Sequence, residues 1–441
     1  MTRGAAALLC AALVASAHAH PVLTFTEQIV THPSEAGAAS AKPGTEQFPV
    51  TVTLGRKYLR VDAQNTRQIY DFERHRLYRV DLKQKTFEES SLFSVLGFRA
   101  MELENRSHIG SVLDSAKVAS DAQAPALAEH LLSLTAPDAD TVIETVHANG
   151  TTTYRWKTKD LLSVSDATRP LADGYQPEYW RYLRYAIGGH PKIYADLDKR
   201  SGVPEVLRAL QPDGAEKSIT LHLTGVTNPP DAPYSLDGFT RAAPKREPYV
   251  SLQKIGPDAT AALAARAEAA KRDRDTAAAS GKMLDAALAH FAYALTTGDS
   301  GRDWLAQTRE QAQADADATA LASALSAKNA EEADKAIRIL GALRTKTQSP
   351  YAYLLDVFAA NHHFAMRHLT EARQLFLSAL AANPYLTSAW FDLGEIYYHM
   401  SQTEAAWACW DAARALTPDH PFGKNVDAVE RQMVSDHPEL F

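Results

Sequence analysis

The chain has 441 residues, of which 45% are hydrophobic and 22% charged, a composition typical of a folded protein with more than one domain. Its formal net charge of −7 at pH 7 is mild. A general nucleic-acid binder needs a basic surface that displaces counterions from phosphate, so this charge argues against that class.

The first 19 residues have the pattern of a signal peptide. Arg3 precedes an apolar run from Ala5 to Val14, and Ala17 and Ala19 supply the small residues that signal peptidase reads. That run is too short to span a bilayer, and no later stretch reaches that length, so we expect no transmembrane span. We expect cleavage before His20 and export to the periplasm of a Gram-negative bacterium. The alternative is a buried N-terminal helix.

Residues 20–228 are expected to form a β-rich domain. Val50 to Leu54 alternates apolar and polar residues, the period of a half-buried strand. A charged turn between Ile69–Phe72 and Leu77–Leu82 indicates a hairpin. Helical sequence follows from about Leu92 to Leu134, with a break near 119–125. Further strands are expected at 58–62, 141–146, 152–157 and 161–164, and a final hairpin joins 202–207 to 217–226 through Asp213-Gly214.

A proline-rich linker is expected over residues 229–257, because prolines gather there without periodicity. They are Pro229, Pro230, Pro233, Pro244 and Pro248. From Asp258 onward alanine dominates and β-branched residues become rare, which favours helices. We expect a helical domain over 258–441. Its helices should lie near 258–279, 281–297, 302–327 and 330–344, followed by two helical pairs between 350 and 418 and a last helix near 422–435.

Two blocks of the helical domain repeat with an offset of 34 residues. The aligned pairs are Ala372 with Ala406, Phe376 with Trp410, Ala379 with Ala413, and Pro384 with Pro418. The second block also carries Trp390, Leu393, Gly394 and Tyr397. We expect Gly394 and Ala406 to meet where the paired helices cross, because small side chains permit close approach. The prolines should end each second helix.

This pattern resembles the tetratricopeptide repeat superfamily, most specifically in the second block. The first block departs from it at Asp356 and Ala360, where an aromatic residue and a glycine would stand. The resemblance implies a superhelix whose concave face, built from the first helices, binds a peptide or a partner helix. Mapped on this sequence, that face consists of Leu354, Val357, Asn361, Phe364, Ser388, Phe391, Glu395 and Tyr398. The alternatives are that its aromatic residues pack on neighbouring helices, or that the region is a generic α-bundle.

The β-rich part resembles the lipoprotein-carrier (LolA-like) half-barrels of the bacterial envelope over residues 21–226. The resemblance rests on the order of strands, helical insert, strands and hairpin, and on segments such as Ile69–Phe72 beside Leu77–Asp81. It implies helices that plug the mouth of a curved sheet whose concave face holds an acyl chain. Near that mouth would lie Tyr179, Trp180, Tyr182 and Tyr185. The alternative is that these aromatic residues simply pack on the sheet.

No motif in the sequence supports a reaction. A Gly-x-Ser-x-Gly motif, a phosphate loop and a dinucleotide-binding glycine motif are all missing. His362, His363 and His368 lie close together, but adjacent residues point about 100° apart on a helix, so we expect no metal site. Cys409 would be the only cysteine of the mature chain, and its place in a repeat helix favours burial over nucleophilic chemistry. We therefore expect neither an enzyme nor a cofactor.

Together these features predict an α+β protein with two domains. The N-terminal domain is expected to be an antiparallel β half-barrel with a helical insert, and the C-terminal domain an all-α tetratricopeptide-like superhelix. The first functional hypothesis is an envelope scaffold whose repeats bind a protein partner. The second is a lipid or lipoprotein carrier that acts through the β domain.

Overall fold

The computed structural model describes residues 20–31, 44–116, 125–136, 139–213, 215–230, 233–297 and 301–441. The segment 1–19, which we predict to be a signal peptide, lies outside these residues, and so does Gly214 of the predicted final turn. Within the described part of the chain, no helix has both the length and the apolar character needed to cross a membrane.

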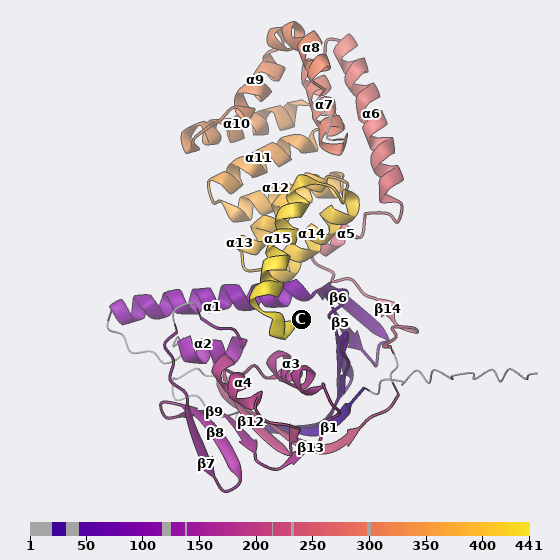
Figure 1. The fold of residues 1–441 in the computed structure, drawn as a ribbon. Helices are drawn as coiled ribbons and strands as arrows, with labels where there is room; N and C mark the ends of the chain where they lie inside the picture. Colours follow the sequence, from indigo (N-terminus) through magenta and orange to yellow (C-terminus); the bar gives the residue numbers. More distant parts are fainter. Residues whose placement is uncertain are drawn as a thin grey trace, which may run out of the picture. The chain divides into compact units, whose positions relative to one another are not determined.

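The protein is α+β, as the sequence predicts. The described strands form a 12-stranded open sheet and a separate pair, β10-β11 (Figure 1). The strand order of the large sheet is β14-β6-β5-β4-β3-β2-β1-β13-β12-β9-β8-β7. Strand β1 pairs antiparallel with β2 and β13, whereas β14 pairs parallel with β6. The sheet is therefore mixed, and the prediction of a wholly antiparallel sheet is wrong at the edge supplied by β14.

The strands predicted from alternation are present. In β2 the side chains of Val50, Val52 and Leu54 are buried, as expected for the apolar side of a half-buried strand. The strands of the large sheet are β1 (Val22–Thr31), β2 (Gly44–Leu54), β3 (Tyr58–Ala63), β4 (Thr66–Asp71), β5 (Arg76–Asp81), β6 (Thr86–Ser91), β7 (Glu144–Ala148), β8 (Thr151–Trp156), β9 (Lys159–Ser165), β12 (Val206–Asp213), β13 (Ala215–Thr227) and β14 (Thr240–Arg241). The separate pair consists of β10 (Thr168–Arg169) and β11 (Val203–Pro204).

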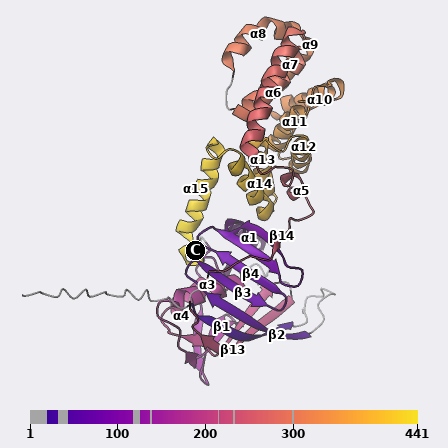
Figure 2. The same ribbon diagram turned by 90° about the vertical axis from the view of Figure 1, so that its right-hand side faces the viewer.

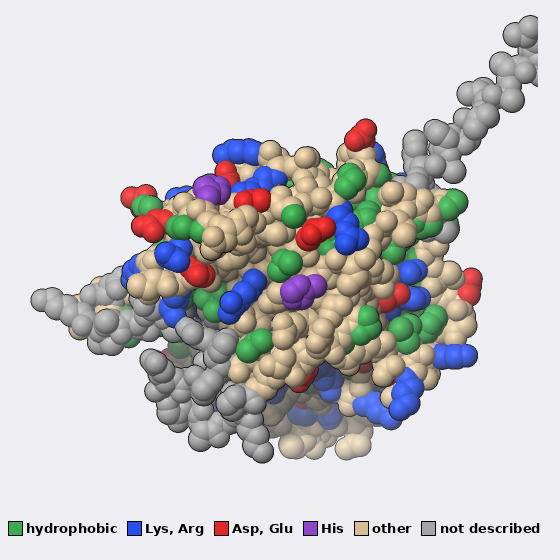
Figure 3. Space-filling view, turned by 90° about the horizontal axis from the view of Figure 1, so that it is seen from below, with side chains coloured by type: hydrophobic (Ala, Val, Ile, Leu, Met, Phe, Trp, Pro, Cys, Tyr) green, Lys and Arg blue, Asp and Glu red, His purple; other side chains and the backbone are tan. Residues whose placement is uncertain are grey.

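Two compact units interleave along the chain. The first comprises Met1–Ile69, Asp81–Lys85 and Ser120–Phe239, and the second comprises Tyr70–Val80, Thr86–Ala119 and Thr240–Phe441. The domain boundaries expected from the sequence, at 228 and 258, remain a prediction. On the face of the molecule shown in Figure 3, basic and acidic side chains are interspersed, so neither sign of charge dominates there.

Among the described residues of the first unit, three helices accompany the sheet: α2 (Pro125–Leu132), α3 (Gln176–Ala186) and α4 (Pro191–Leu197). Figure 1 shows α3 and α4 on the concave side of β1, β12 and β13. Phe25 of β1 stacks on Tyr182 of α3, with ring centroids 6.1 Å apart. Helix α2 packs on β12. The concave side of this sheet is therefore covered by helices, and aromatic rings fill part of the space between them.

The helices of the second unit are α1 (Leu92–Ser115), α5 (Tyr249–Leu252), α6 (Ala259–Ala279), α7 (Met283–Thr297), α8 (Arg302–Ala314), α9 (Ala316–Leu325), α10 (Ala330–Lys346), α11 (Tyr353–Ala365), α12 (Leu369–Ala382), α13 (Thr387–His399), α14 (Thr403–Leu416) and α15 (Pro421–Asp436). The single helix predicted over 302–327 is wrong. Asp315 accepts hydrogen bonds from the backbone N–H groups of Asp317 and Ala318 and so caps a new helix, α9. The segment 229–257, predicted to be a proline-rich linker, contains β14 and α5.

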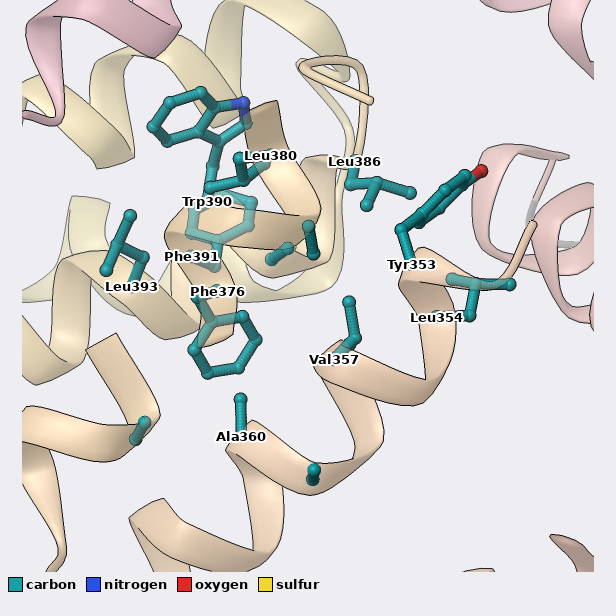
Figure 4. Packing of buried hydrophobic residues seen from close by; sticks show 14 of the residues in the cluster. Tyr353, Leu354, Val357, Ala360, Phe376, Leu380, Leu386, Trp390, Phe391 and Leu393 are labelled. Atoms are coloured by element: carbon teal, nitrogen blue, oxygen red, sulfur yellow. The ribbon is translucent and has the colours of Figure 1, made fainter. Parts of the chain in front are cut away.

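Helices α11 and α12 form one hairpin, and α13 and α14 form the next. Each helix of the second hairpin begins 34 residues after its counterpart in the first. Helix α12 packs on α13, so the hairpins are stacked (Figure 1). Phe376 and Trp390 are fully buried in this stack, and Val357 and Ala360 of α11 point towards Phe376 (Figure 4). The recurrence in the sequence therefore corresponds to recurring helical hairpins.

Two glycines allow neighbouring helices to approach α14 closely. A Cβ atom at Gly394 of α13 would lie 2.3 Å from Nε1 of Trp410, and one at Gly97 of α1 would lie 2.7 Å from the ring of Trp407. We expected Gly394 to meet Ala406; Ala406 is buried, but the nearest side chain to Gly394 is Trp410. Helix α14 thus packs on both α13 and α1, each time with an indole over a glycine.

Candidate functional site

The predicted binding surface comes from the first helices of the two hairpins, α11 and α13. We call it the first-helix face and define it by Asn361, Phe364, Ser388, Phe391, Glu395 and Tyr398. Asn361 and Glu395 are exposed, whereas Phe364, Ser388 and Tyr398 are half-buried and Phe391 is only 4% exposed. The six positions therefore differ in how much surface they offer a partner.

Phe391 is covered by the start of α15. Its ring stacks on that of His420 at 5.0 Å and contacts Phe422 edge-on at 6.1 Å. Nδ1 of His420 accepts a hydrogen bond from the backbone N–H of Phe422, so its Nε2–H is left to donate to Ser388 Oγ at 3.4 Å. Burial lowers the pKa of His420, in keeping with a neutral ring. Phe391 and Ser388 are thus packing residues of the α13–α15 contact.

Tyr398 packs against α14, with ring centroids 5.9 Å from Trp407 and 5.8 Å from Trp410. Burial raises the pKa of its phenol, with a smaller contribution from the charge of Glu104. One side of the Tyr398 ring therefore packs against side chains of α14. The alternative weighed for the aromatic residues, packing on neighbouring helices, therefore describes Tyr398 as well as Phe391.

Helix α7 packs on the first helices. It contacts α9, α11 and α13, and in Figure 2 it lies beside α6 and α9. Its Phe291 packs edge-on against Phe358 of α11 at 5.2 Å. Leu354 and Val357, which the repeat pattern placed on the concave face, are 0% and 6% exposed. The accessible part of the first-helix face is therefore its C-terminal half.

That accessible part is polar and aromatic. Phe364 lies 5.9 Å from the ring of His399, and His399 Nε2 lies 3.8 Å from a carboxylate oxygen of Glu395. Asn361 is exposed one helical turn before Phe364. An aromatic ring bordered by an amide, a carboxylate and an imidazole offers both apolar contact and hydrogen bonds, the combination used in peptide recognition.

Asp392 is a residue of this region that the sequence reasoning missed. Burial raises the pKa of its carboxyl to about 7, and the nearby charge of Glu395 adds to that effect. It lies between the buried residues Phe391 and Leu393 in α13. A single acidic residue between two apolar neighbours is the sequence signal that could have identified Asp392. Near neutral pH its charge state is divided between ionised and neutral forms.

The repeat positions lie where small and bulky residues are needed. Fully or almost fully buried are Ala372, Phe376, Ala379, Pro384, Trp390, Gly394, Tyr397, Ala406 and Ala413, whereas Trp410 is half-buried and Pro418 is exposed. Trp390 Nε1 donates a hydrogen bond to the carbonyl oxygen of Pro384 at 2.8 Å. Pro384 follows the end of α12, so this bond ties the loop to the first turn of α13.

The aromatic residues predicted to lie at a ligand mouth belong to α3. Tyr179, Trp180 and Tyr182 are 0–3% exposed, and Tyr185 is half-buried. Tyr182 stacks on Phe25, and Trp180 lies edge-on to Tyr194 of α4 at 6.4 Å. Three of the four therefore pack in the interior of the first unit. Among the described residues, Tyr179 Oη and Trp180 Nε1 have no hydrogen-bond partner, although both atoms are buried.

A buried cluster of Glu129, His130 and His190 is the other polar centre of the first unit, and the sequence reasoning did not identify it. Its three residues are at most 2% exposed. His190 Nε2–H donates to Glu129 at 2.7 Å, while its Nδ1 accepts from the backbone N–H of Lys192. His130 Nδ1 accepts from the backbone N–H of His190, and its Nε2–H donates to the carbonyl of Leu210.

Every ring nitrogen of this cluster is thus engaged in a hydrogen bond. Burial lowers the pKa of His130 to about 4. The turn beside it requires glycine: Gly188 has a φ of +72°, and a Cβ there would lie 2.7 Å from the carbonyl oxygen of His130. A catalytic base needs a free lone pair that faces substrate. This cluster has none, so we interpret it as a structural connection between α2 and α4.

The histidines that we weighed as metal ligands have other partners. His362 Nε2 lies 3.1 Å from the carbonyl oxygen of Ala324, and the rings of His363 and His368 lie 5.7 Å apart. Across the part of the chain that the structure describes, no group of three His, Cys, Asp or Glu side chains is placed to hold a metal ion. Cys409 is fully buried, and burial raises the pKa of its thiol well above the usual value.

Comparison with models of known protein families gives no match, and comparison with curated proteins gives none either. The geometry of each unit is therefore the basis on which a function can be proposed.

Proposed function

We propose that this protein is an exported binding protein of the bacterial envelope, with a tetratricopeptide-like helical array that docks a protein partner. The observation that carries the proposal is the 34-residue recurrence. It corresponds to two stacked helical hairpins whose small and bulky repeat positions are buried. In arrays of this kind the first helices form the binding surface. Here that surface is the C-terminal half of the first-helix face, around Asn361, Phe364 and Glu395.

Binding rather than catalysis is the role that the polar groups support. The most buried acid and histidines, Glu129, His130 and His190, use their hydrogen-bonding groups on one another and on the backbone. The buried thiol of Cys409 has a raised pKa, which disfavours the reactive thiolate. Neither centre offers an activated group to a substrate.

The test is site-specific photo-crosslinking of the full mature chain in envelope extracts. A benzophenone amino acid at Asn361 should capture the partner, and the same label at Glu371, which is exposed on α12, is the matched control. Glu395→Arg should then abolish capture at Asn361, whereas Glu371→Arg should not. Equal capture at both positions, or capture that survives Glu395→Arg, would overturn the proposed surface. Export is tested separately, by the mass of the secreted chain, which should begin at His20.

A lipid or lipoprotein carrier is the second candidate, and one observation favours it. Tyr179 Oη and Trp180 Nε1 are buried beneath the concave sheet without a hydrogen-bond partner among the described residues. Such groups are costly unless a water molecule or a ligand satisfies them. The polar end of an acyl ligand would do so. Native mass spectrometry of the purified chain decides the matter, because a carrier retains its lipid mass and loses it on mild collisional activation.

A further inference from the structure

A cavity of about 560 Å³ lies in the second unit, between β6, the segment 240–259 and α14. This volume falls within the range of ligand-binding sites. One part of its wall is apolar and consists of Ala242, Ala243, Pro244, Tyr249, Leu252, Ile255, Ala408, Ala412 and Leu416. The other part is the edge of β6, with Glu89, Ser90 and Ser91. The cavity therefore combines apolar surface with the backbone of an edge strand.

The edge of β6 is only partly paired. Strand β14 covers Thr86 and Phe87, and the N–H of Ala242 donates to the carbonyl of Phe87 at 2.8 Å. Beyond Phe87, no strand among the described residues pairs with β6 on this side. Backbone groups alternate along a strand, so Glu89 directs its N–H and C=O groups, and Ser91 its N–H group, to the same edge as Phe87. The carbonyl of Ser91 accepts from Ser94 Oγ at 2.6 Å. Among the described residues this edge therefore has no partner strand beyond Phe87, although α14 also contacts β6.

The segment that contains β14 stops pairing with β6 shortly before Pro244. After Ala242 and Ala243, Pro244 has no N–H to donate to a β-ladder. The segment then forms the opposite wall of the cavity, with Leu252 and Ile255. The cavity is therefore the space between β6 and a segment that stops pairing with it after two residues.

The charges at the cavity are already paired. The two carboxylate oxygens of Glu89 contact Arg76 at 3.5 Å and Arg241 at 3.2 Å. Arg76 also donates to Asp411 at 2.7 Å. Ser91 differs from them: it is 3% exposed, and its hydroxyl has no hydrogen-bond partner in the described part of the chain. A ligand recognised here would use backbone hydrogen bonds and apolar contact rather than a net charge.

We propose that the open edge of β6 and this cavity bind an extended peptide segment of another protein. The bound peptide forms a new strand along β6, next in line after β14. It exchanges backbone hydrogen bonds with Glu89 and with the N–H of Ser91, and one of its apolar side chains packs against Ala408 and Ala412. Strand addition at a free edge is an established mode of peptide recognition. This surface is separate from the first-helix face, so either proposal can fail without the other.

The test uses the full mature chain and the blocked peptide acetyl-Thr-Val-Thr-Leu-Thr-Val-Thr-amide. Hydrogen exchange should slow at residues 86–91 when the peptide is added at up to about 1 mM. The same peptide with alternate amides N-methylated cannot complete a β-ladder and should bind at least about tenfold more weakly.

Two variants locate the site. Ala412→Phe fills the cavity and should weaken binding at least about tenfold, whereas Ala330→Phe, at an exposed position of α10, should not. Glu89→Pro removes an N–H from the open edge without removing a bond to β5, and should also abolish the exchange protection. The proposal is overturned if residues 86–91 stay unprotected, if the N-methylated peptide binds equally well, or if Ala412→Phe binds like the native chain.

Discussion

The glycines inside the helices test how closely the second unit packs around α14. Replacing glycine by alanine in an unobstructed helix stabilises it by about 0.8–1 kcal/mol. Gly341 of α10 has no neighbouring atom within 4 Å of its would-be Cβ, so Gly341→Ala should show this full gain. At Gly394 the new methyl group would lie 2.3 Å from Trp410 Nε1, and at Gly97 it would lie 2.7 Å from the Trp407 ring.

In those two places an indole must move, and inserting a methyl group into a packed interior costs about 1–3 kcal/mol. Trp410 Nε1 also donates to the carbonyl of Phe391 at 3.2 Å, a bond worth about 1 kcal/mol that the shift would break. After subtracting the gain in helix propensity, we expect Gly394→Ala to destabilise the second unit by about 1–3 kcal/mol. Gly97→Ala should destabilise it by about 1 kcal/mol.

The measurement is urea unfolding of the mature chain, followed by tryptophan fluorescence and circular dichroism. Of the six tryptophans in the sequence, Trp304, Trp390, Trp407 and Trp410 belong to the second unit, so its unfolding dominates the emission. The three alanine variants share one chemical change and differ only in what surrounds it. If all three stabilise the protein to the same extent, the close approach of α13 and α1 to α14 is wrong.

Three further predictions concern buried charges. The pKa of His130 is lowered to about 4 from an ordinary value of 6.5, so only the unfolded chain takes up the proton between those values. The contribution of His130 to the free energy of unfolding should be constant above about pH 6.5 and fall by about 3 kcal/mol as the pH drops to 4, so the difference in urea midpoint between the native chain and His130→Gln should change over that range. The contribution of Asp392 has the opposite sign, because its raised pKa of about 7 makes ionisation unfavourable in the folded state. That contribution should fall as the pH rises from 4 to 7, and Asp392→Asn should add roughly 2–4 kcal/mol at pH 8 in the same assay. Arg414 pairs with Asp411, Asp427 and Glu430, so Arg414→Met should cost about 2 kcal/mol in urea unfolding; an unchanged midpoint would show that these ion pairs add nothing.

Local patterns identified many of the elements correctly. Alternation of apolar and polar residues revealed β2, because it depends on neighbours two residues apart. The 34-residue offset revealed α11 to α14, because the same pattern of small and bulky residues recurs in both blocks. The break between α8 and α9 was missed for a related reason. Asp315 caps α9 within an alanine-rich run that has neither glycine nor proline, so composition alone favoured one long helix.

Contacts between distant segments could not be inferred in this way. The cluster of Glu129, His130 and His190 joins two helices about 60 residues apart, and no periodicity relates them. Two residues of β14 pair with β6 from inside a segment whose prolines indicated a linker. The repeat pattern correctly identified α11 and α13, the two helices that carry the six positions of the first-helix face. It did not indicate that the start of α15 covers Phe391 or that α7 packs on α11 and α13.

The last helix of the stacked hairpins, α14, shows how a contact between distant segments affects the proposed binding role. A terminal repeat normally needs a polar outer face, because no further repeat covers it. Helix α14 instead carries Trp407, which is fully buried. Its ring lies over Gly97 of α1, and its Nε1–H donates to Glu430 of α15 at 2.9 Å. Helix α1 precedes α14 by some three hundred residues and belongs to the predicted helical insert of the β domain, yet it covers the last repeat helix.

A fragment that begins at Asp258 would lack this cover. Removing α1 would expose the ring of Trp407 and would also leave Thr403 Oγ1 without its acceptor, the carbonyl of Ser94 at 2.8 Å. Asp411 would lose Arg76 in the same fragment, because that arginine lies on β5. Exposed aromatic surface on a helix promotes association, so the isolated repeats would bind nonspecifically through a face that the whole chain buries. The proposed partner binding therefore has to be measured on the full mature chain, in which Tyr70–Val80 and Thr86–Ala119 belong to the second unit.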